Sequence, residues 1–147
     1  MLDRVGRGRG SVVLVGGEPG VGKTRLAEEL AHEASRLGIL TLSGRCSDME
    51  GAPPYVSFVE ILEALIAVLP AGALRDALDA LGDEVAEVAR LAPRLRRIFP
   101  DISEPLRLPP EQERRYLFNS IREFLERTSR SQPLLLVVED LHWADEP

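Results

Sequence analysis

The first third of the chain alternates between short apolar runs and a helical pattern. A run rich in β-branched residues predicts a strand over residues 11–16, as is typical of a strand buried in a sheet. Apolar positions then recur along one helix face over about residues 22–37, and Gly38 follows as a C-cap. Another apolar run predicts a strand over residues 39–43. Residues 11–46 therefore form a predicted β-α-β unit.

The middle of the chain, residues 55–100, carries a helical pattern. Ser57 and Glu60 form a capping box, which predicts a helix that begins there and runs to about residue 69, before Pro70. Shorter helices rich in Leu, Ala and Arg are expected at about residues 72–81, 83–91 and 93–98. A proline-rich loop over residues 100–110 closes this helical segment.

The last stretch, residues 110–145, combines a long helix with a strand. Apolar positions spaced i, i+1, i+4, i+7 and i+8 predict a helix over about residues 110–130. The run over residues 134–138 is continuously apolar, which is typical of a strand covered on both faces. The whole chain has 147 residues, a length that fits one domain.

A glycine-rich loop links the first predicted strand to the first predicted helix. It reads GEPGVGKT and matches the pattern G-x-x-x-x-G-K-[ST] of a phosphate-binding loop. Its glycines permit positive φ, so that successive N–H groups form an anion nest at the helix N-terminus. Lys23 can reach the β- and γ-phosphates, and the Thr24 hydroxyl can ligate Mg²⁺. The predicted nucleotide-binding residues are Gly17, Glu18, Pro19, Gly20, Val21, Gly22, Lys23, Thr24 and Arg25.

Two acidic residues, Glu139 and Asp140, directly follow the last predicted strand. Carboxylates at the carboxyl end of a buried parallel strand lie where open α/β sheets bind ligands. Phosphoryl transfer from a magnesium nucleotide needs one acid that holds the metal's water shell and one group that orients the nucleophile. The pair can supply both, whereas the alternative is a solvated pair at a strand end.

Composition and charge limit the classes of binding partner that we expect for this chain. The formal net charge is −6, which makes the chain a poor non-specific partner for nucleic acid or for an anionic membrane. No apolar run approaches the roughly 20 residues of a membrane span, and the N-terminus lacks the apolar stretch of a signal peptide. The single cysteine, Cys46, cannot form an internal disulfide. We therefore expect a cytoplasmic protein without direct membrane or nucleic-acid contact.

Several stretches together resemble a known family. They are GEPGVGKTRL at residues 17–26, GRC at 44–46, PY at 54–55, RRYLF at 114–118 and LLLVVEDLHWAD at 134–145. The chain resembles the AAA-type, origin-recognition-complex-like P-loop ATPase domains of bacterial multidomain signal-transduction ATPases and LuxR-type regulators. The resemblance implies ATP and Mg²⁺ as ligands. It also implies Lys23 and Asp140 as catalytic residues, and Thr24 and Glu139 as the residues that hold the metal.

The same resemblance implies a three-layer P-loop NTPase fold with a mostly parallel sheet in the strand order 5-1-4-3-2. The strands before the phosphate loop, after its helix and before the acid pair would be strands 1, 2 and 3. The Gly-Arg-Glu stretch that such domains usually carry upstream of strand 1 is not visible, and the sensor-1 strand, the arginine finger and the helical lid would lie beyond Pro147. We therefore expect the chain to be truncated at both ends and to be part of a larger protein. Residues 12–15 would then face an open gap or pair directly with residues 134–138, and the isolated chain would be marginally stable.

These features favour an ATP-binding regulatory module of the AAA or STAND type, which hydrolyses ATP with Mg²⁺ in its full-length protein. Its partners would be ATP, other domains of a larger chain and, depending on nucleotide, a second copy. The alternative is an interaction module that binds nucleotide without hydrolysing it. A GTPase is less favoured because Asn119 is followed by Ser120 and gives no Asn-Lys-x-Asp motif. A small-molecule kinase lacks a recognisable phosphate-acceptor site.

Overall fold

The computed structural model describes residues 10–47 and 54–144 of the chain. Asp145, at the end of the LLLVVEDLHWAD stretch, lies outside these ranges.

The described elements follow the predicted order closely. They are α2 (Lys23–Arg36), β1 (Leu40–Arg45), α3 (Val56–Val68), α4 (Ala71–Asp79), η1 (Gly82–Glu84), α5 (Val85–Leu91), α6 (Arg94–Ile98), α7 (Pro110–Ser131), β2 (Leu134–Glu139) and η2 (Leu141–Trp143). Each predicted helix is confirmed with ends within two residues of those expected, and so are the strands predicted over residues 39–43 and 134–138. Gly38 follows α2 with a φ of 73°, which confirms its role in ending the helix.

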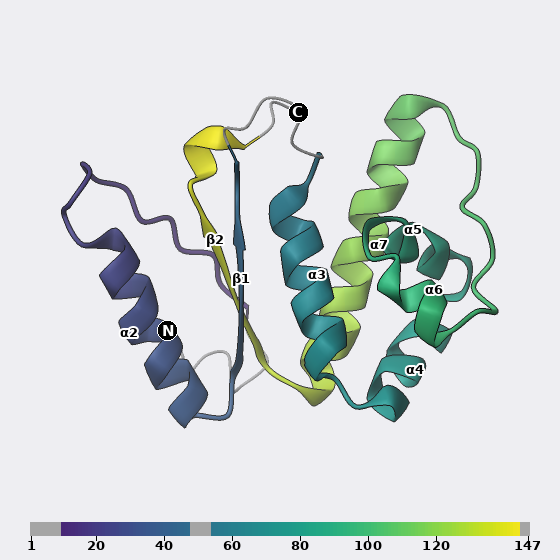
Figure 1. Cartoon of the computed structure of the whole chain (residues 1–147), viewed down its shortest axis with the longest axis horizontal. Helices are drawn as coiled ribbons and strands as arrows, with labels where there is room; N and C mark the ends of the chain where they lie inside the picture. Colours follow the sequence, from purple (N-terminus) through teal and green to yellow (C-terminus); the bar gives the residue numbers. More distant parts are fainter. Residues whose placement is uncertain (1–9, 48–53, 145–147) are drawn as a thin grey trace.

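β1 and β2 form a two-stranded parallel sheet, with Leu40 opposite Leu134 and Arg45 opposite Glu139. This pairing agrees with the adjacency of strands 3 and 2 in the order implied by the resemblance. Helix α2 packs on one face of the sheet, and α3 packs on the other with α7 beyond it (Figure 1). Mixed helices and strands with parallel pairing fit an α/β fold of the P-loop type.

The prediction of a strand over residues 11–16 is wrong. These residues take no strand conformation, and their side chains are exposed, Val12 by 91% and Leu14 by 79%. β-propensity alone does not make a strand, because the backbone N–H and C=O groups need a neighbouring strand as partner. Within the described residues no strand pairs with this segment. Of the two arrangements expected for residues 12–15, direct pairing with residues 134–138 therefore does not occur.

Helices lie on both faces of the sheet, in line with the prediction of a strand covered on both faces, but the residues of β2 are all only half-buried. Leu134, Leu136 and Val138 point to the side where α3 and α7 lie and pack against the main core. The alternate residues face α2, which covers the sheet more loosely: Ala34 is the only residue of α2 that is buried.

The main core lies between α3 and the helices α4 to α7. Its fully buried side chains include Ile61, Leu62, Leu65, Leu74, Leu95, Leu117 and Phe124. Of the sheet, Leu42 joins this cluster as a buried residue. The hydrophobic stabilisation of the protein is therefore concentrated in residues 56–124, away from the glycine-rich loop.

The capping box predicted at Ser57 and Glu60 does not form. Helix α3 begins one residue earlier, at Val56, and its first hydrogen bonds run from the N–H groups of Phe58 and Val59 to the carbonyl of Tyr55. Ser57 is therefore already inside the helix, where it is buried, and no side chain caps the helix start. The Glu60 carboxylate instead accepts a hydrogen bond from the Arg45 backbone N–H, at 2.8 Å. Glu60 therefore bonds to the backbone of β1 and not, as the sequence pattern suggested, to the start of its own helix.

Gly44 gives a direct test of how closely α3 approaches β1. A Cβ atom at Gly44 would lie 2.1 Å from the backbone oxygen of Ser57, so Gly44→Ala must push the helix away. We expect a loss of about 1–3 kcal/mol in the free energy of unfolding, measured by urea denaturation. Gly72→Ala in α4 is the control, because its added Cβ meets nothing within 4 Å. It should be neutral or stabilising by up to about 1 kcal/mol, and equal effects of both variants would contradict the close packing.

Candidate functional site

The glycine-rich loop leads directly into α2. Gly17, Gly20 and Gly22 have φ values of 152°, 83° and 101°, which confirms the positive φ predicted for them. Gly22 is the N-cap of α2; no side chain caps the helix, and its first turn carries no acidic residue. The N–H groups and the positive end of the helix dipole are therefore not neutralised by the protein itself, which suits an anion.

Lys23, the only lysine of the chain, lies across this loop. Its Nζ donates hydrogen bonds to the carbonyl oxygens of Gly17, at 2.8 Å, and Glu18, at 3.0 Å. Thr24 and the loop residues before Lys23 are exposed. The loop and the Thr24 side chain are therefore accessible from solvent, as binding of a phosphate group would require.

The acid pair lies at the carboxyl end of β2. Glu139 is the last residue of the strand, and Asp140 turns the chain into η2 with a left-handed φ of 57°. Their side chains are 25% and 45% exposed. The glycine-rich loop before α2 and the carboxyl end of β2 lie toward the same end of the sheet (Figure 1). Ligands of open α/β sheets bind at this end.

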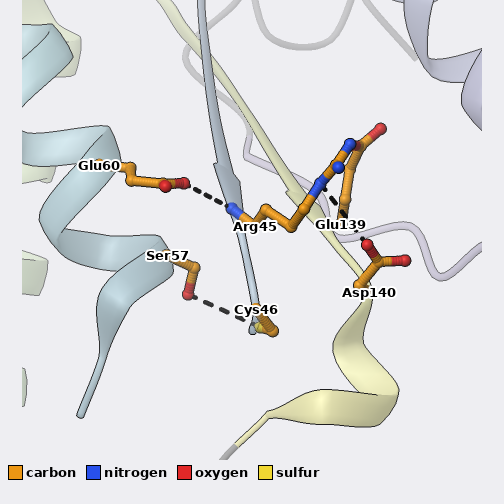
Figure 2. A network of polar contacts seen from close by, with 6 residues as sticks. All are labelled: Arg45, Cys46, Ser57, Glu60, Glu139 and Asp140. Atoms are coloured by element: carbon orange, nitrogen blue, oxygen red, sulfur yellow. Dashed lines mark hydrogen bonds and ion pairs between the residues drawn. The ribbon is translucent and has the colours of Figure 1, made fainter. Parts of the chain in front are cut away.

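Arg45 joins the acid pair, and sequence reasoning gave it no role. Its Nη2 donates to the Glu139 carboxylate at 2.7 Å, and its Nε lies 3.5 Å from the Asp140 carboxylate (Figure 2). The hydrogen bond with Glu139, followed by the charges of Glu139 and Asp140, raises the pKa of the guanidinium above its ordinary value. The GRC stretch at residues 44–46 pointed to this position, but only the strand register places it opposite Glu139.

The charges of Glu139, Asp140 and Arg45 bear on whether this end of β2 can hold a metal. Two carboxylates and one guanidinium leave one net negative charge where the resemblance implies a magnesium site. Carboxylate oxygens suit Mg²⁺, which protein sites of this kind hold through one or two carboxylates and water together with substrate phosphates. In the described part of the chain, no group of three or more His, Cys, Asp and Glu side chains could form an all-protein metal site. The carboxylate oxygens of Glu139 and Asp140 are of the kind that a magnesium nucleotide uses.

The model of the AAA ATPase domain family matches residues 1–147 of the chain. This chain belongs to the AAA ATPase domain family. Neither the curated proteins nor the solved structures compared with the chain gave a match. The AAA part of the resemblance is thus confirmed over the whole chain, and an AAA domain is typically a module that binds ATP. Among the described helices, none combines the length and apolar character needed to cross a membrane.

One hollow of this AAA domain lies apart from the predicted site residues. It measures about 630 Å³ and is lined by residues of α5 and α7 and by Pro54 and Tyr55 before α3. Tyr55 also makes an edge-to-face ring contact with Phe118, at 5.3 Å between centroids. This contact brings together the PY and RRYLF stretches quoted for the resemblance, and its immediate effect is to fix the start of α3 against α7.

The exposure of Arg45 leads to a prediction about the fold. Its side chain is 64% exposed, and exposed ion pairs contribute little to stability. Arg45→Ala should leave the urea midpoint of unfolding close to that of the parent chain. Arg122→Ala, which removes an exposed ion pair with Glu126 on α7, is the matched control. A drop as large as that of Gly44→Ala would show that Arg45 is needed to hold the sheet together.

Proposed function

We propose that this AAA domain binds ATP with Mg²⁺ and acts as a nucleotide-dependent regulatory module that hydrolyses ATP in its full-length protein. The observation that carries the proposal is the uncapped start of α2 behind a loop of positive-φ glycines, with Lys23 and Thr24 at its base. The family match over residues 1–147 supports ATP as the nucleotide.

In this proposal the loop holds the phosphates. The N–H groups between Gly17 and Arg25 surround the phosphate oxygens, including those of Glu18, Gly20 and Val21, while Pro19 lacks an N–H and shapes the turn. Lys23 exchanges its bonds to the Gly17 and Glu18 carbonyls for the β- and γ-phosphates. The Thr24 hydroxyl would be a ligand of Mg²⁺, which would neutralise phosphate charge when bound.

The acid pair would act on the other side of the phosphates. Glu139 would help to hold Mg²⁺ through its water shell, and Asp140 would orient the attacking water or accept its proton. The Arg45 guanidinium contacts both carboxylates and must loosen its hold before they can serve Mg²⁺ and water fully. Among the described residues, Arg45 is therefore the cation that opposes the metal at the acid pair.

The contact of Arg45 with both acids also favours a second candidate function. If the guanidinium stays in place, the domain binds nucleotide without hydrolysing it and uses the ligand to stabilise an interaction surface. The hydrolysis rate of the full-length protein, with and without Mg²⁺, separates the two functions.

The biological setting follows from the resemblance. We propose a cytoplasmic signal-transduction or transcription regulator in which this domain communicates with other domains of a larger chain. Self-association that depends on nucleotide fits the same picture. The acidic net charge of −6 argues against direct nucleic-acid binding by this segment.

Lys23→Ala tests the phosphate loop. The change removes the only lysine and should weaken binding of a fluorescent ATP analogue by about 1.5–3 kcal/mol, the value of a charge-assisted contact. Arg36→Ala, at the other end of α2, removes a cation that pairs with Glu33 and should leave the affinity unchanged. Equal affinities of Lys23→Ala and the parent would contradict the loop's role.

Asp140→Asn separates binding from turnover. In the full-length protein it should leave ATP binding nearly intact and lower the hydrolysis rate by about 10²-fold or more, the scale of a lost general base. Glu139→Gln should instead make binding less dependent on Mg²⁺, as shown by binding titrations at several Mg²⁺ concentrations. Normal hydrolysis by Asp140→Asn would show that the roles are assigned to the wrong residues.

A further inference from the structure

The Glu60 carboxylate has an unusual target for a residue in the first part of a helix. It accepts the backbone N–H of Arg45 at 2.8 Å, across a gap of 15 positions in the chain (Figure 2). The N–H groups of Leu40 and Cys46 bond to the β2 side of the ladder. Because N–H groups alternate in direction along a strand, the Arg45 N–H points to the open edge of the sheet. Glu60 therefore supplies the partner that a further strand would otherwise provide.

The start of α3 is fixed firmly enough to make this bond specific. The place where a Gly44 side chain would lie is taken by the Ser57 backbone, with 2.1 Å between the added Cβ and the oxygen. One residue further, the buried Cys46 Sγ lies 3.8 Å from the Ser57 hydroxyl oxygen. These contacts hold the first turn of α3 against the end of β1, so that the Glu60 carboxylate is already positioned next to the Arg45 backbone N–H.

Arg45 connects this contact to the acid pair. Its backbone bonds to Glu60, while its side chain bonds to Glu139 and lies against Asp140. The Glu60 bond adds to the ladder bond of the next residue, from the Cys46 N–H to the Glu139 carbonyl, in fixing the backbone from which the guanidinium extends. A guanidinium on a fixed backbone loses less conformational freedom when it pairs with carboxylates than one on a frayed strand end.

We infer that Glu60 is a positioning residue, which holds the Arg45 backbone so that the guanidinium stays on Glu139 and Asp140 and thereby raises the Mg²⁺ concentration that nucleotide binding requires. The inference rests on the proposed function for its effect on Mg²⁺, whereas the hold on Arg45 is independent of nucleotide. It assigns to α3 a role in setting when the acid pair becomes available to the metal.

The position of Arg45 is measured first, on the nucleotide-free chain by ¹⁵N NMR and amide hydrogen exchange. Glu60→Ala should speed exchange of the Arg45 amide by about tenfold or more and move its Nε–H signal toward that of a free arginine. Glu60→Gln keeps an acceptor oxygen and should stay close to the parent. Glu63→Ala, one turn further along α3, removes the same charge and should change neither signal.

The second measurement is the Mg²⁺ concentration at half-maximal binding of a fluorescent ATP analogue. Arg45→Ala should lower it by roughly three- to tenfold, because a competing cation leaves the acid pair. Glu60→Ala should also lower this Mg²⁺ concentration, but by a smaller factor. In a chain that already carries Arg45→Ala, Glu60→Ala should cause no further decrease. Urea unfolding of each variant gives the purely structural effect of the change.

The outcomes are separable. An unchanged Arg45 Nε–H signal in Glu60→Ala, or an equal Mg²⁺ effect of Glu60→Ala with and without Arg45, overturns the inference while leaving the proposed function in place. Absence of saturable, Mg²⁺-dependent ATP binding by the parent overturns the proposed function, and the NMR result then still decides whether Glu60 holds Arg45. A lower Mg²⁺ requirement that depends on Arg45 supports both.

Discussion

The parallel pairing of β1 with β2 is the constraint on which the candidate site depends. The ladder sets Arg45 directly opposite Glu139, 94 positions away in the chain. Because side chains alternate between the faces of a strand, this one register sends Leu134, Leu136 and Val138 toward the core and leaves Arg45 and Glu139 together on the opposite face. A shift by one residue would exchange the two sets and separate the guanidinium from the carboxylate.

The sheet also separates the apolar core from the glycine-rich loop that we propose to bind phosphate. On one face, α3 and the helices around it bury the large apolar side chains that account for most of the hydrophobic stabilisation. On the other face, α2 buries only Ala34, and the loop before it is exposed from Gly10 to Gly22. The glycine-rich loop can therefore change conformation around an anion without disturbing the core, which suits a module whose state depends on its ligand.

Charge compensation links the two ends of the proposed site. Lys23 bonds to neutral loop carbonyls, whereas Arg45 bonds to the carboxylates at the end of β2. A nucleotide offers phosphates to the lysine, and its metal offers a competing positive charge to the acid pair. A magnesium nucleotide would therefore rearrange both the Lys23 contact and the Arg45 contact. Because Glu60 helps to fix the Arg45 backbone, the Arg45 side chain has less freedom to leave the acid pair.

The sequence by itself determined the helices, the strands over residues 39–43 and 134–138, and the positive φ of the glycines in the loop before α2, because periodicity and glycine spacing act locally. It misplaced a strand over residues 11–16, since a strand exists only with a hydrogen-bonded neighbour. It also assigned Glu60 to a local cap. Only the tertiary structure decided that Glu60 bonds to Arg45 and that Arg45 contacts Glu139 and Asp140. Both contacts join segments that are distant in the sequence, and strand register and helix packing bring these segments together.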